Sequence, residues 1–155
     1  MRHRLNSVHP AAWLALGLIW LALGQGRLMA ADPRLKFEAQ LIWATNDHQS
    51  PDPTHKAVDA DILKKLQDLP LKWTNYFSVN RRVIEVGATP AKMAMSEKCE
   101  IEVKNVGNGS LEVALFGKHE QLVKRTQALP KGETLVLGGN APNSTAWLVV
   151  LKRLE

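Results

Sequence analysis

Cysteine is nearly absent from this sequence, and that shortage limits how the fold can be held together. Cys99 is the only cysteine among 155 residues, so no disulfide can form within the chain. The alternating apolar residues around it predict a buried, unreactive thiol. A bridge to another chain and a reactive thiol are the two alternatives. The fold must therefore depend on its hydrophobic core, for which a chain of this length is sufficient.

Residue patterns of hydrolytic enzymes are also lacking. The sequence has no G-x-S-x-G segment, in which a serine nucleophile would stand on a strained turn. After residue 30 the histidines that could act as a base are His48, His55 and His119. Glu100 and Glu102 could form a carboxylate pair, but Lys104 follows in the same alternation, which indicates a charged, solvated strand face. We therefore predict that the protein is not an enzyme.

No run of basic residues could follow a nucleic-acid backbone. Lysine and arginine occur singly or in pairs, namely Lys64-Lys65, Arg81-Arg82, Lys124-Arg125 and Lys152-Arg153. The first thirty residues carry three of the 20 basic residues and no acid, so the remainder has 17 basic residues against 15 acidic ones. Nucleic acid is therefore excluded as a partner.

One long apolar run is present, at the start of the chain. Arg2 and Arg4 precede the run Ala11 to Leu23, and small residues follow at Ala30 and Ala31. This order is typical of a secretory signal peptide that is cleaved after Ala30 or Ala31. The alternative is an anchor that stays attached, but the run is shorter than the roughly 20 residues that cross a bilayer. We expect residues 1–30 to be a signal peptide and 31–155 to be one secreted or periplasmic domain, with no membrane span after cleavage.

Alternating apolar and polar residues predict a series of β-strands in the remaining chain. The segment 98–117 is the clearest case, because two alternating runs flank Gly107, Asn108 and Gly109, which reverse the chain easily. Further strands are predicted at 35–43, 71–79, 82–86, 92–96, 121–129, 134–137 and 145–151. The last of these is apolar on both faces, which indicates an interior strand.

A single short helix is predicted at 59–69. Ile62, Leu66 and Leu69 share one face, acids stand at the start of the segment, and Pro70 ends it. Short strands with turn signals between them, together with this helix, predict a mainly β protein. The expected architecture is an antiparallel β-sandwich of about seven to eight strands with one short inserted α-helix.

Two turn motifs resemble those of a known class of sandwich. Val103-Lys104-Asn105-Val106-Gly107 and, one strand later, Leu129-Pro130-Lys131-Gly132-Glu133 follow a V-x-N-x-G and L-x-x-G-E layout. This layout is similar to that of immunoglobulin-like modules in exported bacterial adhesion and surface proteins. The resemblance implies an immunoglobulin-like sandwich and a binding or structural role without catalysis.

Two groups of residues are candidate metal ligands. Between the first strand and the helix, His48, Asp52 and His55 could bind a divalent ion such as zinc, although a solvated loop with prolines is the alternative. A second set of soft ligands comprises Met93, Met95, Cys99 and His119. It lacks the closely spaced histidine and methionine that follow the cysteine in a blue-copper site. Core methionines and a buried thiol explain this set better than a copper site does, and we expect no cofactor.

Aromatic residues are few, at 6% of the chain. Trp43, Trp73 and Trp147 fall in the apolar phase of predicted strands, so we expect all three to pack in the core. Tyr76 is out of phase with Trp73, and we expect it to be exposed and able to contact a ligand. Asn140 and Asn143, in the loop before the last strand, are the other expected ligand contacts.

The sequence as a whole favours an exported, non-enzymatic β-sandwich module. It would have a binding or structural role in the cell envelope or outside the cell, with a protein or an envelope component as its partner. The alternative is a periplasmic protein that binds a carbohydrate or a metal ion, through the residues named above.

Overall fold

The computed structural model describes residues 34–141 and 143–155. The signal peptide predicted at residues 1–30 lies outside these residues. Within the described ranges, no helix is both long enough and apolar enough to cross a bilayer.

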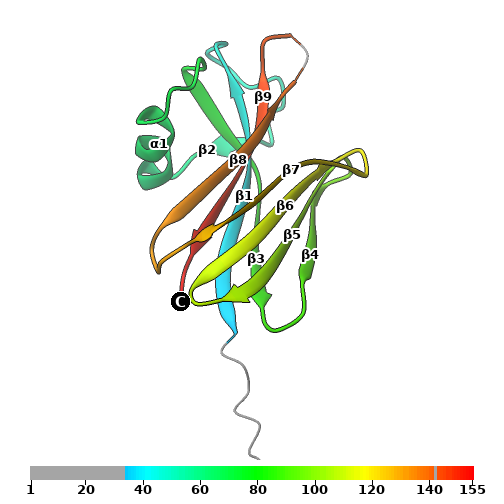
Figure 1. The fold of residues 1–155 in the computed structure, drawn as a ribbon. Helices are drawn as coiled ribbons and strands as arrows, with labels where there is room; N and C mark the ends of the chain where they lie inside the picture. The colour runs from blue at the N-terminus through cyan, green and yellow to red at the C-terminus, as the bar shows by residue number, and fades with distance from the viewer. Residues whose placement is uncertain (1–33, 142) are drawn as a thin grey trace, which may run out of the picture.

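Two antiparallel sheets form a sandwich (Figure 1). The five strands of sheet A, in spatial order, are β2 (Lys56–Ala57), β3 (Asn75–Val86), β1 (Leu35–Thr45), β9 (Ala146–Arg153) and β8 (Thr134–Asn140). The four strands of sheet B are β4 (Ala91–Ser96), β5 (Cys99–Gly107), β6 (Ser110–Gly117) and β7 (Glu120–Ala128). The single described helix is α1 (Ala60–Gln67). The predicted sandwich with one short helix is confirmed, with nine strands because β2 adds a two-residue edge to sheet A.

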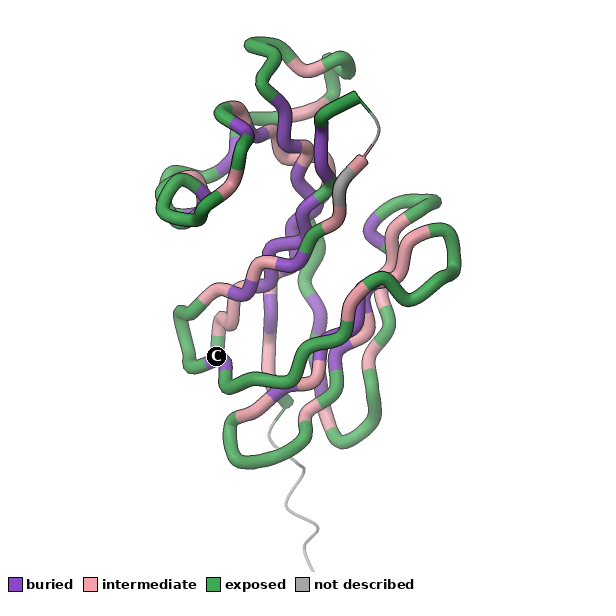
Figure 2. Tube along the Cα trace, turned by 45° about the horizontal axis from the view of Figure 1, so that its top comes forward, coloured by how far each residue is buried: buried purple, intermediate pink, exposed green. Residues whose placement is uncertain are grey.

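The main hydrophobic core lies between the two sheets. Side chains alternate along each strand, so every second residue of β1, β3, β8 and β9 faces sheet B. Figure 2 shows this alternation of buried and exposed positions along the trace. Fully buried members include Phe37, Leu41, Met95, Ile101 and Leu151.

A second hydrophobic core lies on the opposite face of sheet A. There Ile62 and Leu66, one turn apart on α1, pack with Trp73 and Tyr76 and with β1 and β9 residues such as Ile42. Sheet A is therefore buried on both faces. This confirms the interior strand that the two-sided apolar pattern of residues 145–151 predicts.

Polar contacts fix the start of α1 to sheet A. Arg81 on β3 pairs with Asp59, and Lys152 on β9 pairs with Asp61. Gln40 is fully buried between these pairs, and its amide nitrogen donates to Glu38 at 2.9 Å and to Asp59 at 3.3 Å. These contacts fix the orientation of α1 over the second hydrophobic core.

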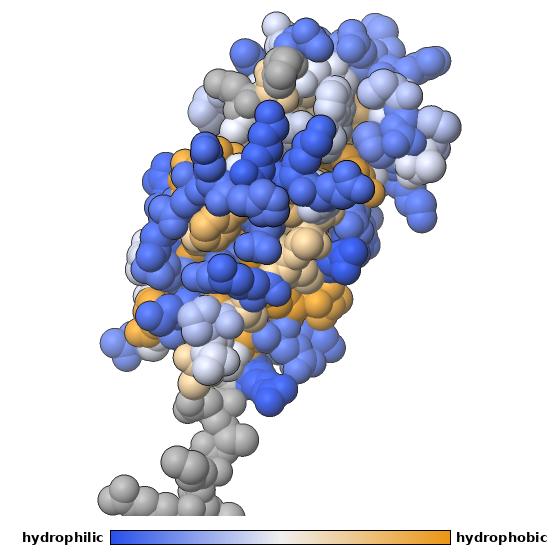
Figure 3. All heavy atoms as spheres, turned by 90° about the vertical axis from the view of Figure 1, so that its right-hand side faces the viewer, coloured by the Kyte–Doolittle hydropathy of each residue, from blue (hydrophilic) through white to orange (hydrophobic). Residues whose placement is uncertain are grey.

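The β5–β6 hairpin forms as predicted. Gly107, Asn108 and Gly109 all take positive φ angles, of 88°, 52° and 73°, which glycine and asparagine adopt at low cost. On the solvent face, Lys92 lies 3.2 Å from Glu102 and Lys124 lies 2.8 Å from Glu112. Figure 3 shows that hydrophilic side chains dominate one side of the molecule, with smaller apolar areas between them.

The predicted strands 71–79 and 82–86 are one strand in the structure. β3 runs from Asn75 to Val86 and passes a bulge opposite Leu41 and Ile42. The extra residue at the bulge shifts the alternation, so the two halves look like separate strands in the sequence. Residues 71–74 lie before the strand, so the alternation of side chains that includes Phe77 does not determine the direction of Trp73.

Candidate functional site

Two tryptophans meet at the end of sheet A where sheet B no longer covers it. Trp43 on β1 and Trp147 on β9 are directly paired in the sheet register, on the face that carries Leu41 and Val149 into the core. In Figure 1 this end of sheet A extends beyond the strands of sheet B. Trp43 is half-buried, and Trp147 is 37% exposed. The prediction that all three tryptophans are core residues is therefore wrong for Trp147.

The two indole rings hold each other in place. Their centroids are 4.6 Å apart and their planes are at 84°, the edge-to-face arrangement that aromatic pairs prefer. The indole N–H of Trp43 is buried and has no hydrogen-bond acceptor among the described residues. The contact with Trp147 thus orients the Trp43 ring.

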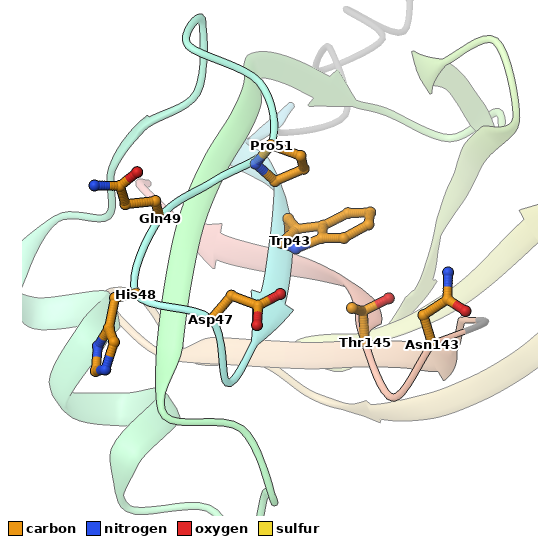
Figure 4. A pocket seen from close by; sticks show the side chains of 7 residues that line it. All are labelled: Trp43, Asp47, His48, Gln49, Pro51, Asn143 and Thr145. Carbon is orange, nitrogen blue, oxygen red and sulfur yellow. The ribbon is translucent and has the colours of Figure 1, made fainter.

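A pocket of about 610 Å³ opens beside Trp43 (Figure 4). It lies between the loop that follows β1 and the turn that joins β8 to β9. Its lining residues are Trp43, Asp47, His48, Gln49, Pro51, Asn143 and Thr145. We refer to it below as the Trp43 pocket.

The loop after β1 forms one wall of the Trp43 pocket. The Thr45 hydroxyl accepts a hydrogen bond from the Asp47 backbone N–H at 3.1 Å and lies 3.2 Å from one Asp47 carboxylate oxygen. Next to Asp47, the side-chain oxygen of Asn46 accepts from the backbone N–H of Thr74 at 3.0 Å. These bonds hold Asp47 where Figure 4 places it, with its carboxylate beside the pocket.

The β8–β9 turn forms the other wall. Asn143 and Ser144 have positive φ angles of 62° and 58°, and the Ala141 N–H donates to the Thr145 carbonyl at 3.0 Å. The indole N–H of Trp73 donates to the Ser144 carbonyl at 2.6 Å. The second core therefore supports this wall directly.

The pocket combines an apolar surface with groups that form hydrogen bonds. Trp43 and Pro51 supply the apolar part, and Asp47 and Asn143 supply a carboxylate and an amide, while the amide of Gln49 points away from Trp43 in Figure 4. This mixture is typical of sites for small polar ligands. Asp47 is the one acidic side chain among the lining residues, and the ring of His48 points away from Trp43 in Figure 4.

The three predicted ligand contacts have different outcomes. Asn143 lines the pocket. Asn140 ends β8 opposite Ala146, and its side chain is outside what the structure describes. Tyr76 is only 7% exposed, and its hydroxyl donates to the Trp73 carbonyl at 2.8 Å. The expectation of an exposed Tyr76 is wrong because the outer face of sheet A is covered by the second core.

The predicted zinc ligands do not form a metal site. Among the residues the structure describes, no group of three or more histidine, cysteine, aspartate or glutamate side chains is placed to hold a metal ion. His48 is an exposed residue at the Trp43 pocket, whereas the side chain of His55 is 8% exposed and packs into its own loop. The solvated-loop alternative describes this segment better.

His55 instead contacts a serine, which the sequence reasoning missed. The Ser50 hydroxyl lies 2.6 Å from Nδ1 of His55, and an Asp52 carboxylate oxygen lies 3.7 Å from Nε2. Asp52 also accepts hydrogen bonds from the Thr54 side chain and backbone, which lower the pKa of its carboxyl group. A catalytic triad needs a carboxylate within hydrogen-bond distance of the imidazole. In this cluster the Asp52 oxygen, at 3.7 Å from the imidazole, is beyond hydrogen-bond distance. The contact between Ser50 and His55 therefore closes a turn and does not complete a triad.

Of the four soft residues considered for copper, Met93, Met95 and Cys99 pack in or against the main core. Met95 is buried between the sheets, whereas His119 is on the exposed β6–β7 turn with a φ of 69°. Burial raises the pKa of the Cys99 thiol to about 11, so the thiol is protonated at neutral pH. Cys99 is partly buried against the core, in line with the predicted unreactive thiol.

Most of the pocket could not be found in the sequence. Trp43 is the last in-phase aromatic residue before a polar segment with prolines, which is a weak signal of a strand end. Its pairing with Trp147 depends on the register of β1 and β9, which are separated by most of the chain. Comparisons of this chain with protein-family models, with curated proteins and with solved structures found no match.

Proposed function

We propose that this protein is an exported, non-enzymatic β-sandwich module that binds a protein or a component of the cell envelope through the Trp43 pocket. The pattern of residues 1–30 supports export to the periplasm or the medium. The rigid two-sheet scaffold and the loops at one end of sheet A support a binding role.

The exposure of Trp147 beside Trp43 is the observation that carries this proposal. Large aromatic side chains stabilise a fold most when they are buried, and aromatic residues are enriched in binding interfaces. Trp147 does not line the pocket, but its ring contacts Trp43, which does. Trp147 is 37% exposed although its strand neighbours Leu148 and Val149 are buried. The edge-to-face contact also orients Trp43 before any ligand arrives, which reduces the entropy lost on binding.

The lining of the pocket supports binding over catalysis. A hydrolytic site needs a nucleophile or an activated water beside a base. Asp47 is already engaged by Thr45, and the imidazole of His48 is turned away from it. The Ser50 and His55 pair closes its own turn and is not among the residues that line the pocket.

The test compares binding by wild type and by Trp147→Ala. The full chain with its own leader is expressed in a bacterial host, its location is found by fractionation, and the purified protein is incubated with isolated cell envelopes. We expect the protein in the periplasm or the medium, with envelope retention that falls at least tenfold in Trp147→Ala. Phe116→Ala, which removes an aromatic ring beside Lys92 on the solvent face of sheet B, is the matched control. Retention that is equal in all three proteins, or residence in the cytoplasm, would contradict the proposal.

A further inference from the structure

We propose that the Trp43 pocket binds the sugar rings of a neutral carbohydrate. This inference rests on the proposed binding function and names the ligand class for the same site. Three properties of the pocket carry it: an oriented indole, polar side chains that suit hydroxyl groups, and the sign of the local charge.

The oriented indole matches the apolar side of a sugar ring. Pyranose rings present C–H groups on one face, and these pack against the electron-rich face of an aromatic ring. Trp147 meets Trp43 edge-to-face at 4.6 Å, so the Trp43 ring is held from one side, and the same ring lines the pocket. Pro51 extends the apolar surface beside the ring.

The polar lining matches the hydroxyl groups at the edge of a sugar ring. Each hydroxyl both donates and accepts, and it is best matched by a carboxylate or a side-chain amide. Asp47 and Asn143 provide these groups from two loops on opposite sides of Trp43, whereas the amide of Gln49 points away from the Trp43 ring in Figure 4. One carboxylate oxygen of Asp47 interacts with Thr45, and the second is the acceptor that a ligand hydroxyl would use.

The local charge selects against acidic sugars. Binding of carboxylate, sulfate or phosphate groups generally uses arginine or lysine. The lining residues include neither, and the carboxylate of Asp47 would repel an anion. The structure therefore favours neutral sugars over uronic acids and sulfated or phosphorylated sugars.

The size of the pocket sets the length of the ligand. Its volume of about 610 Å³ falls within the usual range of about 300–1,000 Å³ for small-ligand pockets. A space of this size accommodates a short segment of a saccharide chain.

The inference is tested with defined oligosaccharides and the purified protein expressed from the full chain. The neutral probes are cellotriose, chitotriose, xylotriose and mannotriose, and the acidic probe is trigalacturonate. Binding is followed by calorimetry and by the indole N–H signals of Trp43, Trp147 and Trp73 in nuclear magnetic resonance spectra. We expect saturable binding of at least one neutral probe, with shifts at Trp43 and Trp147, and at least tenfold weaker binding of trigalacturonate.

Variants connect the binding to the named side chains. Trp147→Ala and Asn143→Gly should each lower the affinity for the neutral probe by about tenfold, which corresponds to about 1.4 kcal/mol. Glycine is chosen at position 143 because the positive φ of Asn143 would strain alanine. Phe116→Ala should bind as wild type does, and thermal unfolding midpoints show whether each variant is folded.

The possible outcomes separate this inference from the proposed function. Absence of neutral-sugar binding at millimolar concentration, tighter binding of trigalacturonate, or full affinity in both Trp147→Ala and Asn143→Gly would overturn the carbohydrate assignment. If sugars fail while envelope retention still depends on Trp147, the binding function stands and its ligand is not a neutral carbohydrate. If both fail, the Trp43 pocket is not a binding site.

Discussion

The indole nitrogen of Trp73 lies 2.6 Å from the carbonyl oxygen of Ser144, although the two residues are 71 positions apart in the chain. Trp73 belongs to the second core, beneath α1, whereas Ser144 is an exposed residue of the β8–β9 turn. Since Asn143 and Thr145 of this turn line the Trp43 pocket, the bond joins the second core to the wall of the candidate site. The shape of the pocket thus depends on a residue that does not line it.

Replacement of Trp73 by phenylalanine tests this link. Trp73→Phe keeps an aromatic ring but removes the donor, and we expect a loss of about 1 kcal/mol in the free energy of unfolding, measured with urea. The Ala141 N–H, which is bonded to Thr145 across the turn, should exchange with solvent faster. Trp147→Phe is the matched control, because the Trp147 indole makes no such bond to the described residues of the turn. Equal exchange of Ala141 in the two variants would show that the Trp73 bond does not hold the turn.

The Cys99 thiol should react slowly in the folded protein. Burial raises its pKa to about 11 from a usual value of 9.0, so at pH 8 the thiolate is about a hundredfold less populated than in the unfolded chain. We expect alkylation by iodoacetamide to be slower by at least this factor in buffer than in urea. Similar rates in both conditions would contradict the burial of the thiol.

The same pKa shift predicts how stability changes at high pH. The folded protein holds the thiol proton more tightly than the unfolded chain does, so this stabilisation is complete below pH 9. It is lost as the pH rises from 9 through about 11. Urea unfolding of wild type and Cys99→Ala should therefore show a difference in stability that changes only in this alkaline range.

The sequence predicted the sandwich because its strands alternate regularly. In the 98–117 hairpin, Ile101, Val103, Leu111 and Val113 are all buried between the sheets, as their spacing requires. Alternation depends only on neighbours within one strand, and a Gly-Asn-Gly turn fixes the pairing of two strands locally. These features need no knowledge of distant parts of the chain.

The candidate site could not be predicted, because it depends on which elements cover which face. Tyr76 does point away from the main core, but α1 and the segment before β3 cover that side. Trp147 does point to the main core side, but sheet B ends before it. The alternation along a strand predicts which face of the sheet a side chain is on. It does not predict whether another sheet or helix covers that face at that position. Of the residues predicted as ligand contacts, Asn143 lines the pocket, and His48, which was predicted as a metal ligand, lines it as well.

The ion pair between Asp61 and Lys152 should make a small contribution that depends on pH. The hydrogen bond from Lys152 lowers the pKa of the Asp61 carboxyl group, and the hydrogen bond to Asp61 raises the pKa of the Lys152 amine. The Asp61 side chain is 57% exposed and that of Lys152 is 30% exposed, so solvent screens the pair and we expect Asp61→Asn to lose only about 0.2–1 kcal/mol at pH 7.

The direction of each pKa shift gives the pH window of this pair. The contribution of Asp61 is present above its usual pKa of 3.8 and is lost as the pH falls through its lower folded value. The contribution of Lys152 is present below 10.5 and is lost at higher pH. The stability difference between wild type and Asp61→Asn should therefore vanish at both extremes. Glu133→Gln, which breaks the exposed pair with Lys65 at 3.5 Å, is the control and should show a smaller difference.

Neighbouring glycines in β8 should respond very differently to alanine. A Cβ atom at position 138 would lie 2.5 Å from Cδ2 of Leu148 and 3.1 Å from the Trp147 carbonyl oxygen, whereas at position 139 the nearest atom is 3.9 Å away. We expect Gly138→Ala to cost about 1–3 kcal/mol of stability through overpacking, and Gly139→Ala to stay within about 0.5 kcal/mol of wild type.

A double variant identifies Leu148 as the source of this difference. In a Leu148→Ala background the 2.5 Å contact is removed, while the contact with the backbone oxygen of Trp147 remains. The cost of Gly138→Ala should then fall without vanishing, because residues in direct contact do not act additively. Urea unfolding of the four proteins of the cycle measures this coupling. An unchanged cost in the two backgrounds would mean that strain at the Trp147 carbonyl, and not the packing of Leu148, keeps position 138 free of a side chain.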